Sequence, residues 1–153
     1  MARKIEIEWP AFKTSVSATL LEKDASDICD MLWADLSTPQ KMFAHHTLST
    51  GGMYIAKGRP AKHPTKAGTQ LMPIGAKKWM LSKFKPGMLA YRGNKEIFVV
   101  YGPTTEALEA GGPPVAKVDQ EDLDKFKKVG EAIWNAQYIT HTLVTMITRR
   151  KEA

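Results

Sequence analysis

The sequence predicts a mainly β domain with two helices, whose strands close into an antiparallel barrel. Apolar and polar residues alternate in most of the patterned segments, which is typical of half-buried strands. A spacing of three or four between apolar residues, typical of amphipathic helices, occurs in only two segments. Turns rather than long crossovers join the strands. The simplest architecture is therefore a closed β-barrel with a helix over each open end.

Composition indicates one domain over residues 1–153. The chain is 43% hydrophobic and 25% charged, which is typical of a globular protein. A chain of this length buries roughly 70% of its unfolded surface, so its core needs no disulfide or metal. The single cysteine excludes an internal disulfide and a cysteine zinc cluster. Because no signal peptide or apolar run of about 18 residues is present, we expect a cytoplasmic protein without a membrane span.

The chain opens with a predicted hairpin. Ile5, Ile7 and Trp9 alternate with charged residues, which predicts a strand from Arg3 to Trp9 that Pro10 ends. The alternation returns from Val16 to Leu20. We therefore expect two antiparallel strands that turn near residues 12–14.

A helix follows from Asp24 to Leu36. Its apolar positions are three or four residues apart: Ala25, Ile28, Cys29, Leu32 and Leu36. Asp24 or Ser26 is available as the N-cap, and Pro39 stops the helix. Cys29 falls on the apolar stripe with no cationic neighbour in sequence, which favours a packed thiol over a nucleophile.

The central segment alternates strands with turns. Glycines 51 and 52 divide the region 43–56 into two short strands, and a loop rich in Pro, Gly and Lys follows from Lys57 to Pro73. Pro86 and Gly87 form a strong turn signal. The remaining strands expected here are Trp79 to Phe84, Met88 to Tyr91 and Glu96 to Tyr101.

The C-terminal part predicts a long loop, a helix and a closing strand. The loop runs from Gly102 to Pro114, the helix from Gln120 to Asn135 with Asp119 as its cap, and the strand from Tyr138 to Arg149.

Trp134 is adjacent to Ile133, so the two side chains cannot share one direction on a helix. We expect one of them to face away from the core. An exposed tryptophan beside further apolar surface is typical of an interface anchor, which predicts a homodimer or higher homo-oligomer. The alternative is that the loop from Gly102 to Pro114 covers this surface.

Charge is unevenly distributed along the chain. The sixty residues from Leu36 to Lys95 contain no acid and eleven bases, whereas the other 93 residues hold all sixteen acids and eleven bases. This segment is expected to create a positive potential that attracts an anionic small-molecule substrate or a nucleic-acid backbone. Each lysine can equally belong to a solvated surface.

The candidate catalytic residues are His45, His46 and Tyr54. The two histidines are adjacent, so on a strand they point to opposite faces and one of them serves a given pocket. A histidine with an ordinary pKa near 6.5 is suited to general acid–base catalysis at neutral pH. A buried tyrosine needs a hydrogen-bonding partner, and such a phenol can also orient substrate.

The candidate substrate-binding residues lie among the bases of the same region. Arg92 matches a carboxylate bidentately. The other candidates are Tyr91, Trp79, Tyr101 and Lys83. The four histidines show no metal-ligand spacing, and no phosphate loop or dinucleotide fingerprint is present, so we expect neither a metal nor a cofactor.

Two stretches carry a resemblance to a known fold family. Residues 17–33 (SATLLEKDASDICDMLW) resemble the passage from strand to helix of the cyclophilin-like barrel, and residues 86–102 (PGMLAYRGNKEIFVVYG) resemble its central hairpin. The chain is similar to small bacterial cyclophilin-like proteins of unassigned function and to the barrel part of cucumopine synthase, an opine-forming enzyme.

The resemblance implies an activity other than prolyl isomerisation. Cyclophilins use a Phe-His-Arg motif followed by Gln-Gly-Gly, whereas residues 43–52 here read FAHHTLSTGG. The arginine is absent and Thr50 replaces the glutamine. Similarity to cucumopine synthase implies a Pictet–Spengler-type condensation of an amine with a 2-oxo acid, and ring opening of a cyclic amide would use the same groups.

Two other functions fit the same residues. A non-catalytic barrel could bind a ligand or peptide. The basic segment could bind nucleic acid through stacking on its aromatic residues, but lysines outnumber arginines nine to two there and no nucleic-acid-binding module is visible. The leading prediction is a cofactor-independent enzyme that acts on an anionic amino or oxo acid by acid–base chemistry.

Overall fold

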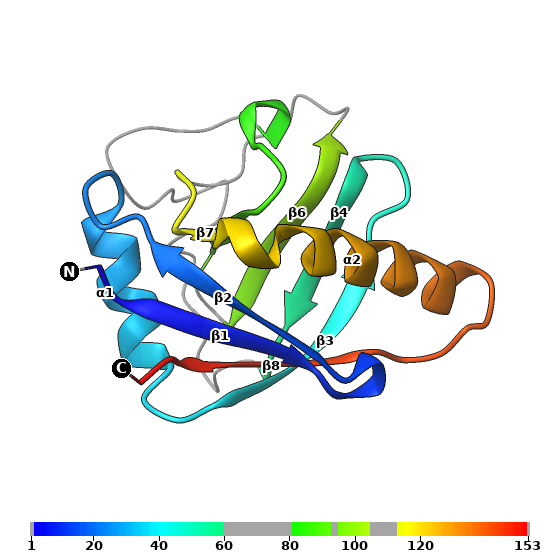
Figure 1. Ribbon diagram of the computed structural model, residues 1–153, viewed down its shortest axis with the longest axis horizontal. Coiled ribbons are helices and arrows are strands. Elements are labelled where there is room, and N and C mark those ends of the chain that lie inside the picture. The colour runs from blue at the N-terminus through cyan, green and yellow to red at the C-terminus, as the bar shows by residue number, and fades with distance from the viewer. Residues whose placement is uncertain (1, 60–80, 93–94, 105–112, 153) are drawn as a thin grey trace.

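Eight antiparallel strands form a closed barrel in a computed structural model of the protein (Figure 1). The structure describes residues 2–59, 81–92, 95–104 and 113–152. The strand order around the barrel is β1, β2, β7, β5, β6, β4, β3 and β8. The strands are β1 (Lys4–Trp9), β2 (Thr14–Leu20), β3 (Gln40–His46), β4 (Gly51–Lys57), β5 (Met88–Tyr91), β6 (Glu96–Thr104), β7 (Ala116–Val118) and β8 (Thr145–Arg150); the helices are α1 (Ser26–Asp35) and α2 (Leu123–Tyr138). This architecture confirms the predicted fold class.

The first hairpin forms as its alternation predicts. β1 buries every second residue, and Trp9 pairs with Thr14 at the end of the ladder. Between them a short 3₁₀ turn, η1 (Pro10–Phe12), ends at Lys13, whose φ of 50° reverses the chain.

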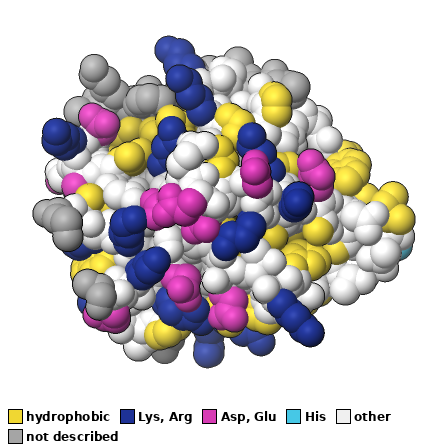
Figure 2. Space-filling model, viewed as in Figure 1, with side chains coloured by type: hydrophobic (Ala, Val, Ile, Leu, Met, Phe, Trp, Pro, Cys, Tyr) yellow, Lys and Arg dark blue, Asp and Glu magenta, His cyan; other side chains and the backbone are white. Residues whose placement is uncertain are grey.

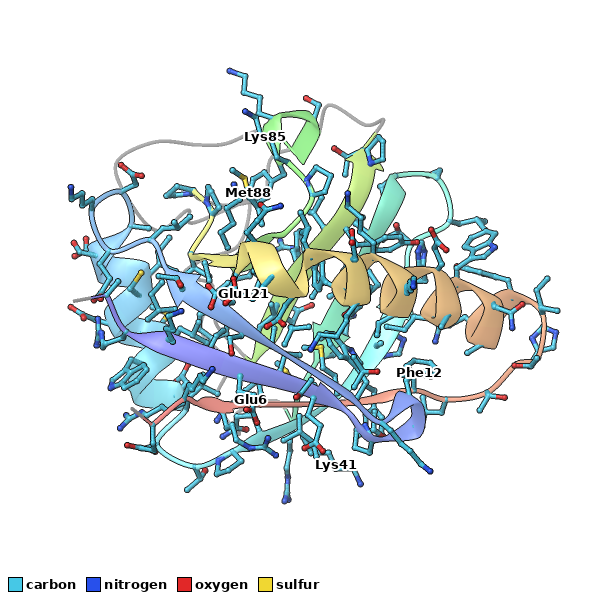
Figure 3. The ribbon with its side chains drawn as sticks, in the orientation of Figure 1. Glu6, Phe12, Lys41, Lys85, Met88 and Glu121 are labelled. Carbon is cyan, nitrogen blue, oxygen red and sulfur yellow. The ribbon has the colours of Figure 1, made fainter. Side chains whose placement is uncertain are left out.

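β8 closes the barrel because it pairs with both β1 and β3. Arg149 on β8 reinforces the seam with β1, since its guanidinium contacts Glu6 at 2.6 Å and Glu8 at 2.9 Å. Figure 3 shows Glu6 on β1 beside this seam.

The barrel interior and the inner sides of the two helices form one apolar core. Phe126 of α2 packs against Trp9 at 6.4 Å between ring centroids. Cys29 of α1 is fully buried and its Sγ donates to the Val115 carbonyl at 3.5 Å. Burial raises the pKa of this thiol to about 11, which confirms the prediction of a packed cysteine.

The two helices contact inward-facing side chains at opposite ends of the barrel. Tyr91 pairs with Ile97 at one end of β6 and hydrogen-bonds Asp35 of α1. Tyr101, four residues beyond Ile97 on β6, lies against Gly130 of α2. In Figure 1, α2 crosses in front of β6 and β4, and α1 lies beside both chain termini. The position of each helix agrees with the expected cover over each end.

Strands β4, β5 and β6 are buried on both faces. Their outward residues join a second, smaller apolar cluster made of Met53, Phe84, Ala90, Phe98 and Val100. This outer cluster explains why β6 reads as an unbroken apolar run instead of an alternating strand.

Several predicted element bounds are wrong. Residues 81–83 form a 3₁₀ turn, η2 (Leu81–Lys83), and not the strand expected from Trp79 to Phe84. β6 continues through residues 102–104, which the sequence assigns to a loop, and β7 was not predicted. Residues 60–73, most of the predicted basic loop, and 105–112 lie outside the described residues.

The last helix and strand also divide differently from the prediction. After the 3₁₀ turn η3 (Gln120–Asp122), α2 extends to Tyr138, so the strand predicted from Tyr138 begins only at Thr145. The helix ends where the Ile139 and Thr140 amides share the Asn135 carbonyl and His141 takes a φ of 54°.

Neither predicted N-cap is present. The residue before α1 is Ala25, without a side-chain cap, and Asp119 does not cap the second helix. Asp119 instead binds Lys4 at 2.6 Å and accepts from the Thr19 hydroxyl at 2.6 Å, because β7 carries it next to β2. Both described helices are too short or too polar to cross a membrane.

Candidate active site

The structure brings together two of the predicted site residues, His46 on β3 and Tyr101 on β6. Nε2 of His46 lies 2.6 Å from the Tyr101 hydroxyl. The imidazole is only 7% exposed, whereas Tyr101 and the loop after β3 reach the surface. A histidine hydrogen-bonded to a tyrosine in this way can exchange a proton with it.

The hydrogen bonds of His46 fix its tautomer. Nδ1 lies 2.6 Å from the Thr47 carbonyl, which can only accept, so Nδ1 carries the proton. Nε2 of the neutral ring is then the acceptor, and the Tyr101 hydroxyl donates to it. Burial lowers the pKa of His46 and raises the pKa of Tyr101 to about 12, so this neutral arrangement holds at pH 7.

The backbone of His46 is clamped by the end of α2. Gln137 accepts from the His46 amide at 2.7 Å and donates to the Ala44 carbonyl at 2.8 Å. The Tyr138 hydroxyl donates to the His46 carbonyl at 2.8 Å. β8 pairs with β3 only as far as Phe43, and beyond it just the Ala44 amide reaches the chain before β8. Side chains of α2 therefore bind the β3 backbone at the end of the strand that β8 does not pair with.

Strand alternation points Tyr101 into the barrel, as it does Ile97 and Val99, and an irregularity of β6 begins beyond Val100. Met53 pairs with Val100, but Gly51 pairs with Thr104, so three residues of β6 face only one of β4. A β-bulge of this kind re-aims side chains and is common beside active sites. Gly52 allows it, because a Cβ there would lie 2.7 Å from the Gly102 Cα.

Two further aromatic residues of α2 form a wall beside the pair. The Trp134 ring meets the His46 ring edge-on at 5.2 Å between centroids, and Tyr138, four residues later, lies 4.3 Å from Trp134. Trp134 is 39% exposed while Ile133 is fully buried, which confirms that the two face different ways. Figure 2 shows apolar side chains gathered at this end of the molecule.

A surface groove of about 370 Å³ continues from this wall. It is lined by Gln137, Tyr138, His141, Thr142 and Leu143. Tyr138 belongs to both the wall and the groove, so the groove begins beside the wall, whereas His46 and Tyr101 do not line it.

The other two candidate catalytic residues make no hydrogen bond with His46 or Tyr101, although Tyr54 lies opposite His46 on β4. His45 is exposed on the outside of β3, opposite Ile55, which confirms that the two histidines point to opposite faces. Tyr54 is 1% exposed in the barrel interior, where its hydroxyl points to the Met146 sulfur at 3.7 Å. Burial raises its pKa. Tyr54 supports the Tyr101 ring at 6.4 Å between centroids.

The predicted substrate-binding residues are dispersed. Tyr91 donates a hydrogen bond to Asp35 at the α1 end of the barrel. Burial is the main cause that raises the pKa of the Tyr91 hydroxyl, and the Asp35 carboxylate is the second. Arg92 lies on the outer cluster, with its guanidinium carbon 4.8 Å from the Phe98 ring centroid. Lys83 is exposed on η2, and Trp79 lies outside the described residues. Only Tyr101 joins His46.

The contributions of Gln137 and Tyr138 to the site were not predicted. The spacing of Trp134 and Tyr138 places them on one helix face and was available as a signal. Nothing local indicates Gln137, because its partners on β3 are more than ninety positions away. Among the described residues, no three His, Cys, Asp or Glu side chains gather as a metal site.

Comparisons with known proteins extend this description. No family model and no curated protein matches the chain. The solved structure of McbB in complex with tryptophan matches 97% of the chain with a TM-score of 0.80 and 28% identity, and the match covers 45% of McbB. The chain thus spans less than half the length of McbB. The resemblance to cyclophilin-like proteins stays a prediction.

A second solved structure shows the same fold. The hypothetical protein AF2241 from Archaeoglobus fulgidus matches 98% of the chain and 95% of its own length, with a TM-score of 0.52 and 10% identity. At this identity the likeness concerns the fold alone. The match covers nearly the whole of both chains, so the barrel and its helices recur in a protein of similar extent.

Proposed function

We propose that this protein is a cofactor-independent enzyme that joins an aromatic amino acid to a 2-oxo acid or aldehyde in a ring-forming, Pictet–Spengler-type condensation. The observation that carries the proposal is the Tyr101 hydroxyl held on His46 beside the exposed Trp134 wall. The tryptophan bound in the structure of McbB supports an aromatic amino acid as the substrate class.

The chemistry needs positioning and proton transfer. The substrate amine attacks the carbonyl carbon, water leaves and an iminium ion forms. A carbon of the aromatic ring then attacks the iminium carbon, which forms the new carbon–carbon bond. The ring carbon finally loses its proton to a base, and aromaticity returns. Holding the reactants together and moving this proton supply the catalysis.

Tyr101 is the group that touches the substrate in this proposal. Both ring nitrogens of His46 are occupied, by the Thr47 carbonyl and by the Tyr101 hydroxyl. The phenol oxygen takes the proton of the substrate carbon while its own proton passes to Nε2 of His46. The product is then released as the imidazolium returns the proton to Tyr101 and Tyr101 gives one to water.

Binding uses the wall and the charge of the basic segment. Trp134 and Tyr138 offer flat faces against which an indole can stack. Arg92 is held on the outer cluster, so it is not assigned as a carboxylate clamp beside His46. The acid-free segment from Leu36 to Lys95 attracts the substrate carboxylates through its field.

Mass spectrometry tests the proposal. The protein is incubated with L-tryptophan and a panel of 2-oxo acids and aldehydes. The expected product has the mass of both reactants less one water and resists borohydride, which reduces an uncyclised imine. L-phenylalanine is the matched control. Its amine should form the imine, but its benzene ring is less nucleophilic than indole and should not close the new ring. No cyclised product from any pair, together with no tryptophan binding, would overturn the proposal.

A further inference from the structure

We infer that Gly130 of α2 is a positioning residue that lets the Tyr101 ring lie against the helix backbone, so that its hydroxyl reaches His46. Gly130 is buried near the middle of α2. Glycine is, after proline, the poorest helix former, so its presence there is not explained by the helix itself. The packing of Tyr101 explains it. The proposed function enters this inference only where enzymatic activity is measured.

The space at Gly130 is filled by the Tyr101 ring. A Cβ built on Gly130 would lie over the face of this ring, because it would be almost equally far from the Cγ, Cδ1 and Cδ2 atoms, at no more than 2.5 Å. Real Cβ atoms essentially never come within 3.0 Å of another heavy atom. Because the ring is rigid and its face meets the helix backbone, an alanine at position 130 must displace the whole ring.

The surroundings of Tyr101 restrict the movement of its ring. The Tyr54 ring supports Tyr101 from the barrel interior at 6.4 Å, and the His46 ring lies at 5.6 Å. The following residue, Gly102, is held against Gly52 on β4. A ring that moves away from α2 therefore takes its oxygen away from Nε2 of His46.

The inferred role predicts a change at His46 itself. The Tyr101 hydroxyl donates to the neutral imidazole and helps exclude water from it, and both effects lower the pKa of His46. Displacement of the ring removes both. The pKa of His46 should then rise toward its ordinary value near 6.5, although position 130 does not bear a titratable group.

The experiment follows the histidine ring resonances by NMR as a function of pH in the wild type, Gly130→Ala and Tyr101→Phe. We expect the pKa of His46 to rise in both variants. His45 and His141 are exposed, so their ring resonances serve as internal controls. An unchanged His46 pKa in Gly130→Ala would overturn the inference.

A second background separates the ring contact from general damage to the helix. In Tyr101→Ala the ring is absent, so adding Gly130→Ala should raise Tm by about 2–4 °C through helix propensity. In the wild-type background the same change should lower Tm or prevent folding. A fall in Tm of equal size in both backgrounds would show a different clash and contradict the inference.

These readouts are independent of the proposed function. A shifted His46 pKa with no condensation activity in the wild type would retain the positioning role and reject the reaction. Activity in the wild type with an unshifted pKa in Gly130→Ala would reject the positioning role and retain the reaction.

Discussion

The Tyr101 hydroxyl and Nε2 of His46 lie 2.6 Å apart although β6 and β3 are not neighbours in the barrel. β4 lies between them, and its partner β6 bulges opposite Gly52. Both side chains point into the barrel, so the Tyr101 hydroxyl reaches His46 across β4. The opposite end of the barrel holds a different pair, Tyr91 with Asp35, under α1.

The stability of the protein should fall in acid because of His46. Burial lowers the pKa of His46 in the folded state below the 6.5 of the unfolded chain. The unfolded state therefore binds more protons as pH falls from 6.5 toward the folded pKa, and stability is lost in that window at up to about 1.4 kcal/mol per pH unit. Above pH 6.5 this contribution is complete.

Denaturant unfolding from pH 8 to pH 5 measures this effect. The wild type should lose more free energy of unfolding below pH 6.5 than His46→Gln, whose side chain does not titrate. His45→Gln is the matched control, since His45 is exposed on the outer face of β3. If the free energy of unfolding changes with pH in the same way in the wild type and His46→Gln, the lowered pKa of His46 is refuted.

Removal of the Gln137 amide should loosen the strand that carries His46. Gln137→Leu leaves the His46 amide and the Ala44 carbonyl without their partners, which should cost about 1–3 kcal/mol of stability. Hydrogen exchange of the His46 amide should become faster. Asn135→Ala, on an exposed position of the same helix, should change neither quantity, and unaltered exchange in Gln137→Leu would disprove the clamp.

Self-association stays a prediction, and the structure shows exposed apolar side chains on which it would depend. Leu48, Ile139 and Leu143 are largely exposed at the same end of the molecule as Trp134. Sedimentation at micromolar concentration should show a dimer that Leu143→Lys and Trp134→Ala weaken. Phe43→Ser, which removes an exposed apolar side chain from the outer face of β3, is the control. A monomeric wild type would end this prediction.

Salt should weaken the capture of anionic substrates. The described bases of the acid-free segment include exposed Lys41, Lys57, Lys83 and Lys85. Calorimetry with a 2-oxo acid at low and high ionic strength should show affinity that falls as salt rises, because exposed charges are screened. Indole, which is neutral, should bind equally in both. Equal salt sensitivity of the two ligands would contradict the role of the field.

The parts of the fold set by local patterning were predictable from the sequence. The alternation of β1 and the opposite faces of His45 and His46 follow from the period of a strand. The three residues of β7 are too few to show a period. α2 continues to Tyr138 because Tyr138 and Gln137 bond the β3 backbone, a long-range contact that outweighs the strand propensity of the Tyr-Ile-Thr run.

Residues of the candidate site were predictable from the sequence, but their arrangement in space was not. His46 and Tyr101 were both proposed from chemistry, yet they are separated by 55 positions and come together only because β4 pairs with both β3 and β6. Arg92 was grouped with the histidines because of its charge. Strand alternation places Tyr91 inward and Arg92 outward, so neighbours in sequence lie in different environments.

The most direct test of the proposed chemistry compares Tyr101→Phe with Tyr91→Phe in the condensation assay. Both changes remove one hydroxyl from an inward-facing tyrosine, but only Tyr101 contacts His46. The account predicts that Tyr101→Phe loses about 10²–10⁴-fold in kcat while tryptophan affinity is kept, and that folded Tyr91→Phe keeps its kcat. Full activity in Tyr101→Phe, or an equal loss in Tyr91→Phe, would contradict it.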